Sequence, residues 1–97
     1  MAVAFLIEIP DFTPEQSAAV LQELGLDKNP AVGQVFHLEG PMEGGGMRIV
    51  DVWDSPEAFQ AFAQERLAVA FQKAGITFPA DMQPNAVWPV TEIFMAK

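Results

Sequence analysis

The sequence predicts a single α+β domain whose elements follow the order βαββαβ. Residues 35–39 and 47–53 alternate between two distinct faces, which is typical of strands. Thr-Pro and Ser-Pro pairs, at 13–14 and 55–56, each precede a stretch with helical spacing of apolar residues. Ninety-seven residues can build one hydrophobic core but not two, so we expect one domain that spans residues 1–97.

The first predicted strand spans residues 3–9, and it is apolar on both faces except at Glu8. This pattern is expected of a strand that is covered on two sides. The first predicted helix runs from residue 14 to about residue 24. Thr13 can cap it, the proline that follows suits its first position, and Gly25 is a good C-terminal stop.

A hairpin is predicted from about Gly33 to Asp54, with a glycine-rich connector at 40–46. One register matches four apolar side chains on one face, with Phe36 opposite Val52 and Leu38 opposite Val50. Burial of each large apolar side chain contributes roughly 1.5–3 kcal/mol. The rival register gains only a surface ion pair between Glu39 and Arg48, which contributes at most ~1 kcal/mol. We therefore predict the first register.

This register has two consequences for the other face of the hairpin. It sets His37 opposite Asp51 and Val35 opposite Trp53. The only histidine of the chain and a carboxylate within an apolar strand are therefore predicted to be cross-strand neighbours.

The second predicted helix runs from residue 56 to about residue 74, where Gly75 ends it. Residues 76–84 are predicted to form a proline-containing connection. A last strand is predicted from residue 86 to residue 94, at an edge of the sheet or with a bulge, because Pro89 lacks a backbone donor.

This order predicts a ferredoxin-like arrangement, in which two helices cover one face of a four-stranded antiparallel sheet. We expect the face away from the helices to carry Leu6, Val35, Ile49, Trp53 and part of the last strand, beside Glu8, His37 and Asp51. Such a face is too apolar to leave in water as one patch. We therefore predict a homodimer through the sheet face, around a partly apolar cavity.

Charge and composition exclude several kinds of partner. A formal net charge of −8 argues against nucleic acid and against docking on anionic membranes, since both need a basic surface. Without cysteine there is no thiolate nucleophile and no cysteine-based zinc site. Residues 1–7 lack a basic segment and are too short to span a membrane, so we expect a cytoplasmic protein.

His37 and Asp51 are the candidate catalytic residues. A histidine oriented by a carboxylate is suited to general acid–base chemistry, although a hydrogen-bonded histidine at an interface fits the sequence as well. Asp51 must be paired if it is buried, with His37, Arg48 or Arg66 as possible partners. No spacing typical of metal ligands is visible, so no metal is predicted, and heme bound by His37 is left as an alternative.

Four further residues are candidates for substrate binding. Trp53 and Trp88 can line a ring-binding pocket or pack in an interface. Glu8 can be a further polar group of the cavity or a strand-end residue in water. Arg66 lies close to the apolar stripe of the second helix, from which it can reach a carboxylate.

The stretch from Val50 to Phe59, "VDVWDSPEAF", resembles the strand-to-helix junction of the dimeric α/β-barrel superfamily. The Val35-Phe36-His37 strand, the glycine-rich connector and the element order extend this resemblance over nearly the whole chain, most closely to small proteins related to antibiotic-biosynthesis monooxygenases. The resemblance implies a homodimer. The superfamily includes cofactor-free oxygenases and heme-degrading enzymes. Quinol monooxygenases of this kind use an Asn and a Trp in the cavity, whereas Asn29 and Asn85 of this chain are predicted to lie in loops.

Two functions follow as hypotheses. The first is a small cofactor-free monooxygenase-like enzyme that acts on an aromatic or polyketide-like molecule. Its substrate would supply the electrons to O₂, so the protein needs only a base, a partner for the oxyanion and a dry cavity. The second is a non-catalytic module of the same fold that binds a small ligand or takes part in an assembly.

Overall fold

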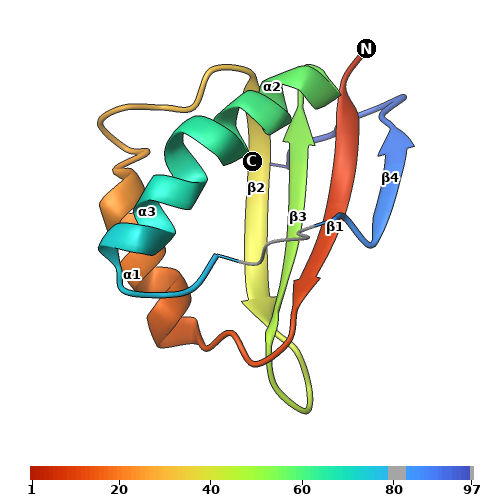
Figure 1. Cartoon of the computed structure of the whole chain (residues 1–97). Helices are drawn as coiled ribbons and strands as arrows, with labels where there is room; N and C mark the ends of the chain where they lie inside the picture. The colour runs from red at the N-terminus through yellow and green to blue at the C-terminus, as the bar shows by residue number, and fades with distance from the viewer. Residues whose placement is uncertain (79–82, 97) are drawn as a thin grey trace.

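Four antiparallel strands and two helical segments form the fold in a computed structural model, which describes residues 1–78 and 83–96 (Figure 1). The strand order in the sheet is β2-β3-β1-β4, and the helices cover one face (Figure 1). The elements, in chain order, are β1 (Val3–Ile9), α1 (Pro14–Leu24), β2 (Gln34–Pro41), β3 (Met47–Trp53), α2 (Pro56–Phe62), the π-helical turn η1 (Ala63–Leu67), α3 (Ala68–Lys73) and β4 (Ala86–Pro89). The ferredoxin-like α+β fold is thus confirmed.

Helix α1 has the bounds and caps that the sequence predicts. The Thr13 hydroxyl accepts from the Gln16 N–H at 3.0 Å, and the Gln16 side chain accepts in return from the Thr13 N–H at 3.0 Å. Gly25 follows the helix in the left-handed conformation, with φ 59°. Its N–H donates to the Leu21 carbonyl at 3.1 Å, so both ends of the helix are satisfied locally.

The second helix is interrupted by a π-helical turn that the sequence does not predict. Helix α2 begins after Ser55, whose hydroxyl accepts from the Ala58 N–H at 3.1 Å. Within η1, Arg66 donates to the backbone carbonyls of Leu24, Asn29 and Pro30 at 2.8–3.2 Å. Arg66 therefore satisfies carbonyls at the end of α1 and in the loop after it, and it pairs with no carboxylate of residues 1–78 and 83–96.

The predicted hairpin register is confirmed at three positions and wrong at a fourth. Phe36 pairs with Val52, His37 with Asp51 and Leu38 with Val50. Trp53, however, pairs with Gln34 rather than with Val35, because the register shifts between Gln34 and Phe36. The extra residue in β2 is a β-bulge, which leaves Val35 half exposed.

The two faces of the hairpin are the reverse of the prediction. His37, Ile49, Asp51 and Trp53 face the helices, where Asp51 is 5% exposed and Trp53 is fully buried. The matched apolar residues Phe36, Leu38, Val50 and Val52 lie on the other face, as do Leu6, Glu8 and Trp88. Both faces of the sheet are rich in apolar residues, so the alternation of the strands fixes the register but not which face meets the helices.

Strand β4 is shorter than predicted, but it lies at an edge of the sheet as expected. The chain leaves the sheet after Pro89, and the Val90 N–H makes a last hydrogen bond, to the Ala2 carbonyl at 2.9 Å. The following residues cross the face of the sheet away from the helices, where 93–95 line a groove with Phe36 and Trp88 (Figure 1). Part of the predicted connection at 76–84, residues 79–82, lies outside the described residues.

An aromatic cluster fills one end of the core between the sheet and the helices. The indole of Trp53 lies 5.7 Å from the Phe59 ring and 5.0 Å from the Phe62 ring, measured between ring centroids. Phe5 stacks on Phe59 at 4.7 Å. Within residues 1–78 and 83–96, no helix combines the length and the apolar character needed to cross a membrane.

Candidate functional site

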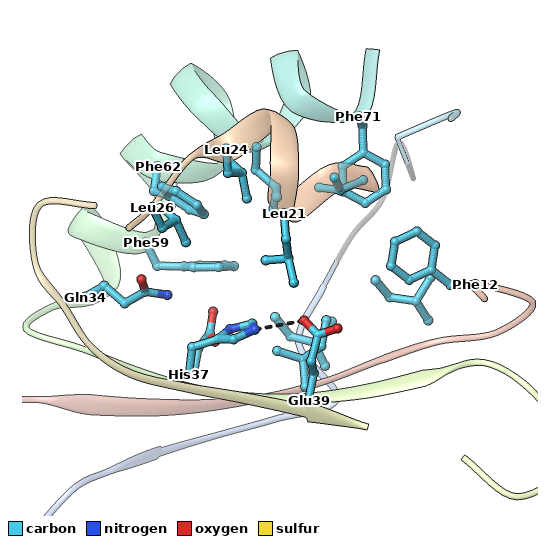
Figure 2. A pocket seen from close by; sticks show the side chains of 16 residues that line it. Phe12, Leu21, Leu24, Leu26, Gln34, His37, Glu39, Phe59, Phe62 and Phe71 are labelled. Atoms are coloured by element: carbon cyan, nitrogen blue, oxygen red, sulfur yellow. Dashed lines mark hydrogen bonds and ion pairs between the residues drawn. The ribbon is translucent and has the colours of Figure 1, made fainter. Parts of the chain in front are cut away.

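A small cavity lies between the sheet and the helices, beside the aromatic cluster (Figure 2). Its volume is about 60 Å³. Twelve of its sixteen lining residues are apolar, namely Ile7, Ile9, Phe12, Val20, Leu21, Leu24, Leu26, Ile49, Phe59, Phe62, Leu67 and Phe71. The other four, Gln34, His37, Glu39 and Asp51, come from β2 and β3 on the sheet side. This cavity is lined by one chain on the helix side of the sheet, whereas the sequence predicts a cavity on the other face, between two copies.

Five polar side chains form one hydrogen-bonded chain along the sheet side of this cavity, which we call the polar network: Ser17, Glu39, His37, Asp51 and Trp53. The Ser17 hydroxyl donates to one oxygen of Glu39. The other Glu39 oxygen lies 2.9 Å from His37 Nε2, and His37 Nδ1 lies 2.5 Å from Asp51 Oδ1. The Trp53 Nε1–H donates to Asp51 Oδ2 at 3.2 Å. An imidazole is thus held between two carboxylates.

Strand alternation and register assemble most of this network. His37 and Glu39 are two residues apart on β2, and Asp51 and Trp53 are two residues apart on β3, so each pair shares the face toward the helices. The register then sets His37 opposite Asp51. Ser17 reaches the network from α1, where its side chain is buried.

Sequence reasoning missed two members of the network. Glu39 enters the sequence prediction only as a surface partner of Arg48 in the rival register, although its spacing of two places it on the same face as His37. Ser17 lies three and four residues before the apolar Val20 and Leu21, and a small polar residue at that position carries little information without the fold.

The electrostatics of the network make His37 a cation. The hydrogen bond to Asp51, together with the charges of Asp51 and Glu39, raises the pKa of His37 from its ordinary 6.5 to about 9, against the opposing effect of burial. At pH 7 both ring nitrogens therefore carry protons and donate to the carboxylates. A ring in this state has no free lone pair, so it can stabilise negative charge or supply a proton.

The network as a whole is negative, and among the described residues neither Lys nor Arg lines the cavity. With both carboxylates ionised, Glu39, Asp51 and protonated His37 sum to −1. Arg48 pairs with Glu8 at 2.6 Å on the opposite face of the sheet, and Arg66 is bound to backbone carbonyls. The positive charge of His37 is already matched by two carboxylates, so the net charge of the network disfavours an anionic ligand.

The structure brings together only some of the residues that the sequence suggests for the site. His37 and Asp51 are in contact, as predicted. Trp53 lies behind them, bonded to Asp51, and does not line the cavity. Trp88 and Glu8 lie on the opposite face of the sheet, so the two tryptophans do not enclose a common pocket. The physical reason is that β2 and β3 turn His37, Asp51 and Trp53 toward the helices, whereas Glu8 and Trp88 lie on the face away from them.

The residues present do not fit heme or a metal ion. Both ring nitrogens of His37 are engaged by carboxylates, so neither is free to bind iron, and about 60 Å³ does not accommodate a porphyrin. In the described part of the chain, no group of three or more His, Cys, Asp or Glu side chains is arranged to hold a metal ion.

Comparisons with known proteins identify solved structures that share the fold of this chain. No family model and no curated protein matches the chain. Among solved structures, a candidate antibiotic biosynthesis monooxygenase from Chloroflexus aurantiacus superposes with a TM-score of 0.62 at 15% identity, over 99% of this chain and 100% of that one. SnoaB, a cofactor-independent oxygenase from Streptomyces nogalater, gives a TM-score of 0.59 at 14% identity over 95% of each chain. A conserved protein from Methanosarcina mazei superposes with a TM-score of 0.61 at 8% identity over 91% of each chain.

The chain thus has the same ferredoxin-like fold as these solved structures, so the resemblance predicted from the sequence is confirmed at the level of the fold. Identities this low show the fold alone. The two asparagines do not line the cavity: the Asn85 side chain accepts from the Glu8 N–H at 2.7 Å, and Asn29 lies exposed in the loop after α1.

Proposed function

We propose that this chain is a cofactor-independent, monooxygenase-like enzyme whose substrate is a small, neutral, electron-rich aromatic molecule of the phenol type. The observation that supports this most directly is the polar network, which sets a protonated imidazole and two carboxylates against an otherwise apolar cavity. Titratable groups with a strongly shifted pKa in a cavity are a typical, though not exclusive, feature of functional sites.

The charge of the network favours a neutral substrate. A carboxylate or phosphate would enter a site that already carries −1 and has no Lys or Arg in its lining. A phenol can instead give its proton to Glu39 or Asp51. The total charge then stays at −1, because the carboxylate becomes neutral as the phenolate forms, and the protonated His37 beside it stabilises the new anion.

The overall reaction balances without a cofactor. An aromatic C–H para to the hydroxyl becomes a carbonyl, and the hydroxyl becomes the second carbonyl of a quinone. The substrate gives up four electrons. One atom of O₂ enters the ring and the other leaves as water. The apolar lining keeps bulk water from the phenolate while it reacts.

The cavity must widen to admit such a substrate. Engineered apolar cavities of about 150 Å³ bind benzene, and the space here is about 60 Å³. The side chain of Leu21 points into the middle of this space and is only partly buried (Figure 2). Rotation of Leu21 is therefore the simplest way to make room for a ring.

Oxidation of 1-naphthol tests the proposed activity. We expect the protein to consume one O₂ for each 1,4-naphthoquinone formed, with one oxygen atom of ¹⁸O₂ in the quinone. Asp51→Asn and Glu39→Gln each remove a carboxylate of the network and should lower the rate by about 10²–10⁴, the range for loss of general acid–base catalysis. Glu23→Gln, an exposed change on α1, is the matched control.

Two results would count against the enzyme. If 1-naphthol binds but no oxygen is consumed, the chain is a ligand-binding module of this fold. That alternative is favoured by the fact that every polar atom of the network already has a partner. If 1-naphthol binds neither to the native chain nor to the wider Leu21→Ala variant, the cavity is not a binding site.

We also propose that two copies of this chain pair through the sheet face away from the helices. In the single chain this face leaves Leu38 49%, Trp88 43% and Ile93 44% exposed, next to Phe36 and Val50. These apolar side chains lie on the same face as the Glu8–Arg48 ion pair, and two identical faces of this kind cover each other when they meet. The polar network lies on the helix side, so pairing would not cover the cavity.

Leu38→Glu tests this pairing. We expect the native chain to sediment near 21 kDa, about twice its 10.6 kDa, and Leu38→Glu to sediment as a monomer, because the new charge would be buried without a partner. Val32→Glu adds the same charge at a residue that is 90% exposed and outside the sheet, and it should leave the dimer intact. A native chain that sediments as a monomer at 50 μM would contradict the proposal.

A further inference from the structure

The β-bulge at Val35 turns the side chain of Gln34 into the cavity. Phe36 pairs with Val52 and Gln34 with Trp53, so Val35 has no partner on β3. In a strand without the bulge, Gln34 would share the face of Phe36, away from the helices. Bulges commonly re-aim a side chain in this way beside functional sites. Figure 2 shows Gln34 at one end of the cavity, near Phe59, with its amide directed inward.

The backbone that carries Gln34 is fixed on both sides. Gly33 has a φ of 89°, and a Cβ at this position would lie 2.7 Å from the Cβ of Ala58. The Gly33 carbonyl accepts from the Asp54 N–H at 2.8 Å, while the Gln34 N–H donates to the Ala31 carbonyl at 3.2 Å. Only glycine allows this close approach of β2 to the start of α2, and the approach holds Gln34 in place.

The amide of Gln34 differs from the other polar groups of the cavity because it is uncommitted. His37, Glu39 and Asp51 bond to one another. Within residues 1–78 and 83–96, the half-buried Gln34 side chain makes no hydrogen bond to protein, and its amide is open to solvent because no buried side-chain N or O there lacks a partner. An amide offers two N–H donors and a carbonyl acceptor without a net charge. Gln34 therefore has the free hydrogen-bonding capacity that a neutral ligand needs.

We propose that Gln34 orients the ligand by a hydrogen bond to its hydroxyl or carbonyl oxygen, and that it thereby makes the site prefer an oxygen-bearing aromatic over a hydrocarbon of the same shape. This inference rests on the proposed function in one respect, because the cavity must admit a ring. It does not require turnover, so it is tested by binding alone.

The test compares two probes of nearly equal shape, 1-naphthol and 1-methylnaphthalene, by titration in the absence of O₂. Gln34→Leu keeps the approximate volume of the side chain and removes the amide. We expect it to weaken 1-naphthol binding about three- to tenfold, as loss of one hydrogen bond does. Binding of 1-methylnaphthalene should stay within about twofold, because it makes no such bond. Gln22→Leu, at an exposed position of α1, is the matched control and should change neither affinity.

The outcomes separate this inference from the proposed function. If Gln34→Leu weakens both probes equally, or neither, the amide does not recognise the oxygen and the role of Gln34 is overturned, while the cavity remains a binding site. If neither probe binds to the native chain or to Leu21→Ala, the proposed function fails and the role of Gln34 fails with it.

Discussion

Replacing His37 by glutamine is expected to lower the free energy of unfolding by about 2–4 kcal/mol at pH 7. The change removes the cation between Asp51 and Glu39 but keeps a polar side chain that can still donate one hydrogen bond. Asp51 is 5% exposed, so its charge would stay buried next to neutral donors and without a cation. The His37 side chain is 27% exposed. We therefore expect a smaller loss of unfolding free energy than the loss caused by breaking a fully buried ion pair.

Urea denaturation of the native chain and His37→Gln measures this effect. The control is the double variant His37→Gln with Asp51→Asn, which also removes the orphaned charge. It should recover a large part of the loss, because most of the penalty comes from the uncompensated carboxylate and not from the missing imidazole. A single variant within 0.5 kcal/mol of the native chain would show that the ring is not held as a cation.

The stability of the native chain should fall as the pH rises from about 6.5 to above 9. The pKa of His37 is raised on folding, from 6.5 to about 9, so the folded state holds its proton more tightly than the unfolded state. The resulting stabilisation is fully present below pH 6.5 and is lost as the pH passes through 9. A shift of this size corresponds to at most about 3 kcal/mol, and partial exposure of the ring reduces it.

The composition of the chain lets the pH dependence of stability be assigned to His37. The chain has one histidine, no cysteine and no tyrosine, so His37 is the only side chain expected to lose a proton between pH 6 and pH 9.5. We expect unfolding free energies from urea titrations at pH 6, 7.5, 9 and 10 to decrease for the native chain. His37→Gln should give a nearly flat series over the same range. A native series as flat as that of the variant would contradict the raised pKa.

Local signals in the sequence determined the order of the elements and the register at the centre of the hairpin. Thr13 and Gly25 bound α1 because caps depend on the neighbouring residues only. The hairpin register followed from the apolar match of facing residues, and it brought His37 next to Asp51. The fold class and the central pair of the candidate site were therefore predictable.

Long-range packing decided what the sequence left open. Both faces of β2 and β3 are apolar enough to be buried, so alternation could not tell which face would meet the helices. The structure turns the polar network inward, since Ser17, Glu39, His37, Asp51 and Trp53 satisfy one another there. Such mutual satisfaction depends on residues far apart in the chain and leaves no mark in a local pattern.

The bulge at Val35 is the second feature that only the tertiary structure decided. Nothing in the residues 34–36 distinguishes a bulge from a regular strand. The close approach of Gly33 to Ala58 and the pairing of Phe36 with Val52 leave one residue too many between them. The sequence by itself determined that the two arms of the hairpin pair and that His37 lies opposite Asp51, whereas packing against the helices determined which side chains, Gln34 and His37 among them, face the cavity.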